Sequence, residues 1–221
     1  MHLPNGSQIF VESSRSAEIP FSDITNNAGS PVLTMTTANA SKVKVGQYVL
    51  FTASSWGKLL NQQLRVKNVT DTSVTVESFD TSDLNQFPAG ASGSIVVINS
   101  WVEIPCVQDL AQDGNEQQYY NYQCLSDDRE QQLPTYKSAV SITYTFAHEF
   151  DNPIYPTLRK ADETGEVKAL RMYVPRATEM RLYSAVLSFN DIPATTMNEM
   201  ETVSLAAALK GRFVSVTADG A

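Results

Sequence analysis

Apolar and polar residues alternate along several segments of the chain. The segment VSITYTF, residues 140–146, places Val, Ile, Tyr and Phe on one side and Ser, Thr and Thr on the other. Residues 181–189 and 202–209 repeat this alternation. A period of two residues is typical of a half-buried β-strand. The pattern therefore predicts a mainly β fold, built as a sandwich or a barrel.

One segment breaks the alternation and predicts a short helix. Asp151 or Asn152 can cap its start, Pro153 falls in its first turn, and Gly165 marks its end. Residues of these types favour helix starts and stops at these positions. We therefore expect one helix of about three turns, close to the mean length of helices in globular proteins.

Residues 20–99 differ from the rest, because they are rich in Ser, Thr, Asn and Val and contain five short strand-like segments. Such a series suits a small closed barrel without free edges. The expected organisation is a β-sandwich domain of residues 1–19 and 100–221, with an all-β barrel domain inserted at 20–99. Trp56 lies in a loop of that barrel, where it either fills the core or forms an exposed contact; we favour the core.

Composition narrows the possible functions. The net charge is −8 at pH 7 and the isoelectric point is near 4.7, which argues against a protein that grips nucleic acid through clustered Lys and Arg. No apolar run approaches the roughly 18 residues of a membrane span, and the first ten residues do not resemble a signal peptide. Cys106 and Cys124 are too few for a zinc motif, and we expect them to stay reduced in a cytosol.

The chain offers little that suggests catalysis. Its histidines are His2 and His148, and it contains no GxSxG, HExxH or phosphate-binding glycine motif. His148 is followed by several carboxylates, which are explained more simply as a strand end, a helix cap and a last helical turn. We therefore expect no enzyme activity and no catalytic, cofactor or metal site, with a hydrolase centred on His148 as a remote alternative.

Residues 110–138 form a long, polar segment that is rich in Gln and Tyr and carries several acidic residues. Long connections without structure of their own are uncommon in compact domains and usually serve an interface. Tyrosine supplies a large contact area at low entropic cost, which favours a protein contact. A mobile surface loop or an extended hairpin arm is the alternative interpretation.

The order of the predicted strands and the helix resembles that of a known family. A strand with the pattern W-V-x-I-x-x-V-x-D-L, residues 101–110, precedes the acidic segment; a strand, the helix, a hairpin and two last strands follow it. This succession resembles the tail tube proteins of long, flexible-tailed phages, whose subunits form hexameric rings stacked into a conduit for DNA. The resemblance covers residues 1–19 and 100–221 and implies a tail-tube β-sandwich.

The resemblance also implies a lumen. Each subunit of such a tube contributes a sheet to the inner wall, and an acidic wall repels DNA, which carries about one negative charge per 1.7 Å of axis. DNA is expected to pass through without specific binding. The residues expected to line the lumen are Glu103, Asp109, Ser141, Thr143, Thr145, Glu199 and Glu201.

By the same resemblance, residues 110–138 reach a neighbouring ring. The expected partners of the tube are tape-measure, tail-terminator and tail-tip proteins, and the expected location is the virion, after assembly in the host cytoplasm without a membrane. The expected contact residues of the acidic segment and their basic partners are Asp113, Glu116, Tyr119, Tyr120, Tyr122, Asp127, Asp128, Arg129, Arg159, Lys160, Arg171, Arg176 and Arg181.

A second function remains open from the sequence. The 20–99 barrel has a Ser-, Thr- and Asn-rich surface and contains Trp56, which could stack on a ligand. The alternative is therefore a virion-associated or tail-tip binding module that contacts a glycan or a protein.

Overall fold

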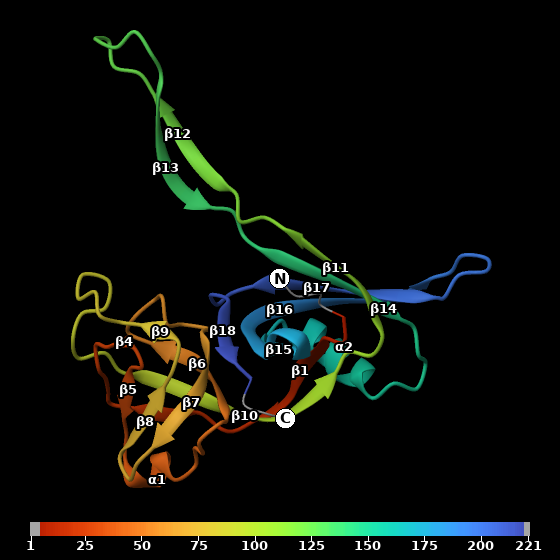
Figure 1. The fold of residues 1–221 in the computed structure, drawn as a ribbon, viewed down its shortest axis with the longest axis horizontal. Coiled ribbons are helices and arrows are strands. Elements are labelled where there is room, and N and C mark those ends of the chain that lie inside the picture. Colours follow the sequence, from red (N-terminus) through yellow and green to blue (C-terminus); the bar gives the residue numbers. More distant parts are fainter. Residues whose placement is uncertain (1–4, 219–221) are drawn as a thin grey trace.

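The computed structural model describes residues 5–218, which form a curled sheet, a small barrel and two projections (Figure 1). The strands are hydrogen-bonded in the order β11-β14-β17-β16-β15-β1-β10-β6-β7-β8-β5-β3, with β18 attached to β16 and β2 attached to β10. The curled sheet occupies one end of this order and the barrel the other. The predicted mainly β fold class is confirmed.

The curled sheet is antiparallel throughout, and its concave side holds the larger apolar side chains. Tyr144, Leu205 and Phe189, on three of its strands, are all buried in one cluster. The alternation predicted from residues 140–146 and 202–209 is thus observed. The strands of this sheet are β1 (Gln8–Arg15), β11 (Val107–Asp113), β14 (Ser141–Ala147), β15 (Val167–Val174), β16 (Glu179–Ala194), β17 (Thr202–Leu209) and β18 (Val214–Thr217).

The predicted helix is α2 (Ile154–Thr164), which lies in the curve of the sheet (Figure 1). The side-chain oxygen of Asn152 accepts a hydrogen bond from the backbone N–H of Ile154 at 3.1 Å, so Asn152 satisfies one of the free N–H groups at the helix start. Gly165 ends the helix in the left-handed conformation, with φ +60°. Ile154 and Leu158 are buried against the sheet, which explains why this segment is helical where its neighbours are strands.

The barrel closes because β2 and β3 are separated only by Ser22. β2 pairs with β10, β3 pairs with β5, and the intervening strands pair in series. A helical turn, α1, follows β5. The elements of this part are β2 (Ile19–Phe21), β3 (Asp23–Ile24), β4 (Ala28–Gly29), β5 (Val32–Thr34), α1 (Thr37–Ala40), β6 (Tyr48–Ser54), β7 (Gln63–Val69), β8 (Ser73–Val76), β9 (Phe79–Asp80) and β10 (Gly93–Glu103).

Trp56 lies inside the barrel, as favoured from the sequence. Its side chain is only 3% exposed, and its ring packs edge-on against Phe87 with 5.1 Å between centroids. The indole N–H donates a hydrogen bond to the backbone oxygen of Pro88 at 2.8 Å. A buried indole whose N–H is satisfied stabilises a core and has no free face for a ligand.

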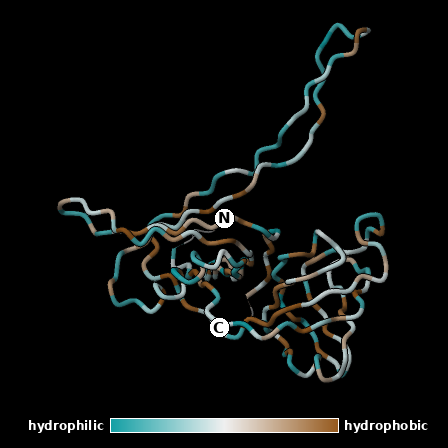
Figure 2. Tube along the Cα trace, turned by 180° about the vertical axis from the view of Figure 1, so that it is seen from behind, coloured by the Kyte–Doolittle hydropathy of each residue, from teal (hydrophilic) through white to brown (hydrophobic). Residues whose placement is uncertain are grey.

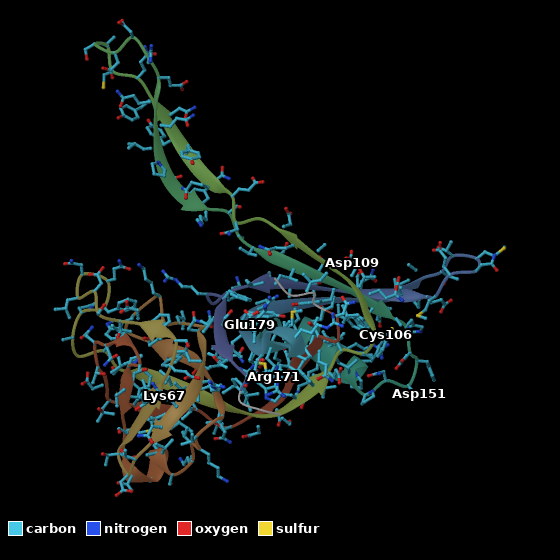
Figure 3. All side chains as sticks on the ribbon, in the orientation of Figure 1. Lys67, Cys106, Asp109, Asp151, Arg171 and Glu179 are labelled. Carbon is cyan, nitrogen blue, oxygen red and sulfur yellow. The ribbon has the colours of Figure 1, made fainter. Side chains whose placement is uncertain are left out.

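The barrel and the curled sheet share strand β10. Its first half pairs with β6 of the barrel and its second half pairs with β1 of the curled sheet. Beside this strand, Arg171 packs over the rings of Phe10 and Trp101, at 4.6 and 4.7 Å from its guanidinium carbon to the ring centres (Figure 3). The division into domains at 19/20 and 99/100 remains a prediction, because β10 continues across residue 99 without a break.

The segment 110–138 is an extended hairpin arm, which the sequence left as an alternative to a contact loop; its protein contact stays a prediction. β11 leads into β12 (Gln117–Tyr122), which pairs with β13 (Gln131–Lys137) before the chain returns in β14. The arm projects far from the body and is mostly hydrophilic or neutral, with hydrophobic positions near its tip (Figures 1 and 2). The sequence did not favour strands here because polar side chains occupy both faces of both strands.

A second projection, here called the tip hairpin, comprises residues 191–201, which are the last four residues of β16 and the connection to β17. The regular pairing of these strands ends at Asn190 and Ser204, and only Ala194 and Thr202 pair beyond it. The tip hairpin extends from the sheet at the end away from β18 (Figure 1).

Candidate assembly surfaces

The convex side of the curled sheet presents a regular face formed by four strands. Cross-strand partners share a face, so the register of β11, β14, β17 and β16 defines its members directly. The rows across the four strands are Asp109, Thr145, Ser204 and Asn190; then Ala111, Thr143, Ala206 and Ser188; then Asp113, Ser141, Ala208 and Val186. We call these twelve residues the small-residue face.

The small-residue face has an unusual character for the open side of a sheet. Its twelve positions include two carboxylates, Asp109 and Asp113, and no basic residue. Most of the others are Ala, Ser or Thr. Alternation places the buried residues of the same strands on the opposite side, toward α2. The face is therefore smooth and weakly acidic, and the core supports it from behind along β14, β17 and β16, whereas β11 has no buried residue.

Four of the predicted lumen residues fall on this face, and three do not. Asp109, Ser141, Thr143 and Thr145 lie in adjacent rows of the small-residue face; Figure 3 shows Asp109 on β11, at the foot of the arm. Glu103 lies on β10, where its carboxylate accepts a hydrogen bond from the amide of Gln8 at 3.2 Å. The two remaining residues, Glu199 and Glu201, belong to the tip hairpin.

Several members of the face were absent from the sequence-based set. Ser188, Ser204, Ala206 and Ala208 also lie in these rows, although none was predicted to line a lumen. The signal was present, because these residues alternate with apolar ones along 181–189 and 202–209. The two alanines were not predicted to line the lumen because alanine is usually assigned to a core.

The arm is a two-stranded hairpin with no third strand. β12 and β13 pair only with each other among the described residues, and an isolated hairpin is marginally stable in water. Its exposed large side chains include Tyr119, Tyr120, Leu133 and Tyr136. The arm therefore offers a tyrosine-rich surface that is suited to a contact with another molecule.

The charged contact residues that we predicted on the arm divide between its two ends. Asp113 and Glu116 are at its base, and Asp127, Asp128 and Arg129 are at its tip. Tyr122 lies near the tip, where its hydroxyl donates a hydrogen bond to the side chain of Gln131 at 2.8 Å. In residues 5–218 none of these carboxylates forms an ion pair, so their charges remain available.

The predicted basic partners differ in availability. Arg159 pairs with Asp191 at 2.9 Å, and Arg181 pairs with Glu179 at 3.0 Å. Arg171 is enclosed by aromatic rings at the junction with the barrel. Of the five predicted basic partners, Lys160 and Arg176 are exposed and form no ion pair within the described part of the chain.

His148 has a structural role. Its Nδ1 forms a hydrogen bond with the hydroxyl of Tyr155 at 2.7 Å, and its backbone N–H donates to the carbonyl of Glu201 at 2.8 Å. Burial raises the pKa of Tyr155, which keeps this hydroxyl protonated. Across residues 5–218, no group of three or more His, Cys, Asp and Glu side chains is placed to hold a metal ion.

A cavity of about 970 Å³ opens at the end of the curled sheet that carries β18. Its apolar lining includes Ile142, Tyr144, Met172 and Tyr183, and Phe213 stands at its rim. The hydroxyls of Tyr144 and Tyr183 are hydrogen-bonded to each other at its floor. Burial raises the pKa of Tyr183 to about 12. We call this cavity the end pocket.

Comparison with known proteins gives one family. A protein-family model described as "Phage tail tube protein, TTP" matches residues 54–218. The match begins inside the barrel, so it is not confined to the segments 1–19 and 100–221 that carried the resemblance in sequence. None of the curated proteins that were compared matches the chain. No helix within residues 5–218 has the length and apolar character needed to cross a membrane.

Proposed function

This chain belongs to the phage tail tube protein family and is a structural component of the virion, not an enzyme; on that premise we propose that it forms stacked hexameric rings around a conduit for DNA ejection. Oligomeric assembly into a tube follows from the family. The ring size, the lumen residues and the stacking contacts are our proposal.

The small-residue face lines the lumen in this proposal. It is the observation that carries the function, because the face is smooth, is backed by a core on three of its four strands and has no partner within the described chain. Ser, Thr and Ala offer DNA neither cations nor large side chains that would hold it. Asp109 and Asp113 add negative charge that repels phosphates.

The seven residues predicted for the lumen are reduced in this proposal to Asp109, Ser141, Thr143 and Thr145. Glu103, Glu199 and Glu201 lie on other surfaces and are not assigned to the wall. Their places are taken by Ser188, Ser204, Ala206 and Ala208. The wall is therefore neutral over most of its area and acidic along one strand.

The arm connects rings in this proposal. Its length and its exposed tyrosines suit a contact with a ring above or below, and its unpaired strand edges can be completed by a neighbouring sheet. Asp127 and Asp128 at its tip would meet basic residues of the next ring, for which Lys160 and Arg176 are the free candidates. Arg171 is left out, because aromatic rings enclose it.

The setting of the tube completes the proposal. We place it in a long, flexible phage tail that is assembled in the host cytoplasm, with tape-measure protein inside and terminator and tip proteins at its ends. DNA passes without specific binding. The alternative of a glycan-binding barrel loses its main support, because Trp56 is buried and has no free face.

Negative-stain electron microscopy across a concentration series tests the proposal. We expect rings or hollow tubes with an open axial channel, and six subunits per ring by mass measurement of short assemblies. Compact single particles at every concentration, also after addition of a tail-tip nucleus, would contradict the proposed self-assembly.

A further inference from the structure

The end pocket has a lining that differs from the chain as a whole. Lys137, Arg181, Lys210 and Arg212 line it, and no Asp or Glu does. The whole chain carries a net charge of −8, so a cavity with four cations and no carboxylate in its lining is a local reversal of charge. Beneath these cations the floor is apolar.

One cation of the end pocket has a nitrogen atom without a hydrogen-bond partner. The Nε of Arg181 is buried and makes no hydrogen bond within residues 5–218, although another nitrogen of the same side chain donates to Glu179 at 3.0 Å. Phe213 at the rim is also 51% exposed. The exposed ring of Phe213 would be stabilised by an occupant that brings an apolar surface.

The tip hairpin has the complementary composition. Ile192, Met197 and Met200 are 75%, 87% and 61% exposed, which leaves three long apolar side chains in water. The same eleven residues, 191–201, contain Asp191, Glu199 and Glu201 and no Lys or Arg. An apolar, acidic projection and an apolar, cationic cavity therefore occur on one chain.

The two features lie at opposite ends of the curled sheet. Figure 1 shows the tip hairpin extending away from β18, and Glu179, the partner of Arg181, marks the other end (Figure 3). A molecule cannot join them within itself, but a second copy placed head to tail can. Repetition of such a contact closes into a ring or continues as a helix.

We propose that the tip hairpin of one copy inserts into the end pocket of the next copy. Met197 and Met200 pack on the apolar floor, and the carboxylates of Glu199 and Glu201 meet the exposed cations of the lining, Lys137, Lys210 and Arg212. This inference rests on the proposed self-assembly and adds the contact that joins neighbouring copies.

The arm tip is the competing occupant. It carries one fully exposed leucine, Leu125, and two adjacent aspartates, but it also carries Arg129, which would meet a cationic rim. The tip hairpin brings three apolar side chains and no cation, so its match in both charge and apolar area is better. The test must nevertheless distinguish the two.

Site-directed cross-linking makes that distinction. In a chain with Cys106→Ser and Cys124→Ser, Met197→Cys and Phe213→Cys are treated with a short bismaleimide after assembly. We expect a ladder of covalent multimers. The matched control combines Met197→Cys with Lys67→Cys on the barrel surface and should stay monomeric. A ladder obtained instead from native Cys124 with Phe213→Cys would assign the end pocket to the arm tip and overturn the proposal.

Charge reversal gives an independent readout. Glu199→Arg should raise the concentration needed for assembly about tenfold, and adding Arg212→Glu should restore it, since opposed charges at a close contact couple. Asp71→Arg on the barrel serves as the control for a change in net charge. Tubes that form equally well with each single variant would refute the contact and leave the tube function intact, whereas failure of the wild type to assemble would remove both.

Discussion

The hydroxyls of Tyr144 on β14 and Tyr183 on β16 form a hydrogen bond to each other across β17, inside the core of the curled sheet. Burial raises the pKa of both groups, that of Tyr183 to about 12. Each hydroxyl satisfies the other, so neither phenol is left unpaired at the floor of the end pocket. Because of this pair, the stability of the sheet should fall at alkaline pH.

The protein should lose stability between pH 10 and pH 12. Below pH 10 the Tyr183 hydroxyl is protonated in the folded and the unfolded state, so its contribution to stability is complete. Above pH 10 the unfolded state ionises first, because burial raises the folded pKa to about 12 from the ordinary tyrosine value of 10.0. The loss from this group reaches up to about 3 kcal/mol. Urea unfolding at pH 8, 10 and 11.5 measures it.

Tyr183→Phe isolates this effect. This variant should lose about 1–3 kcal/mol of unfolding free energy at pH 8, because Tyr144 loses its partner. Its unfolding free energy should also fall less steeply above pH 10 than that of the wild type. Tyr119→Phe, on the exposed arm, should match the wild type at each pH. An unchanged decline in Tyr183→Phe would exclude the buried pair as its source.

Glu12 should be essential for the junction between the curled sheet and the barrel. It is 1% exposed, its carboxylate pairs with Arg15, and it accepts a hydrogen bond from the backbone N–H of Ala169 at 3.0 Å. Glu12→Ala leaves that donor and a charge unpaired, which should destabilise the fold by about 3–5 kcal/mol. Glu12→Gln retains an acceptor and should cost less; equal losses in the two variants by urea unfolding would show that the hydrogen bond to Ala169 is unimportant.

Gly114 should set the direction of the arm. It has φ +87°, and a Cβ there would lie 1.9 Å from the carbonyl oxygen of Ala139. Gly114→Ala should therefore add at least about 1–2 kcal/mol of strain at the arm base and reduce tube formation in micrographs while circular dichroism of the body is retained. The matched control is Gly57→Ala, where nothing lies within 4 Å; normal tubes from Gly114→Ala would contradict the role of the arm in stacking.

A cation on the small-residue face should make the tube bind DNA. Ala206 is exposed at the middle of this face, so Ala206→Lys places six cations in each proposed ring. We expect short duplex DNA to be retained by these tubes at low salt and released as salt rises. Ala206→Glu is the control and should not bind; equal retention by both variants would place this residue outside the lumen.

Some of the assembly surface was predictable because it depends on local periodicity. The positions of Ser141, Thr143 and Thr145 follow from alternation with Ile142 and Tyr144, which holds in any strand with one buried side. The end of α2 was also predictable, because it depends on a single residue, Gly165. The bulged tip hairpin was not, since alternation stops at Asn190 and the carboxylates beyond it have no defined face.

The arm could not be predicted from the sequence for a different reason. Along 117–137 both faces of both strands are exposed, so no apolar period marks them as strands. Arg171 shows a third limit, because the aromatic rings around it come from β1, β6 and β10, which are remote from it in sequence. Its charge suggested a contact surface, whereas packing encloses it.

The sequence by itself determined the strands with one buried side, the helix and the family, because these depend on the order and period of residues along the chain. Only the tertiary structure decided which strands are neighbours, and with that the rows of the small-residue face and the separation of the end pocket from the tip hairpin. The physical reason is that pairing between strands such as β11 and β14, or β16 and β18, is set by the burial of side chains far apart in sequence, and no local pattern records it.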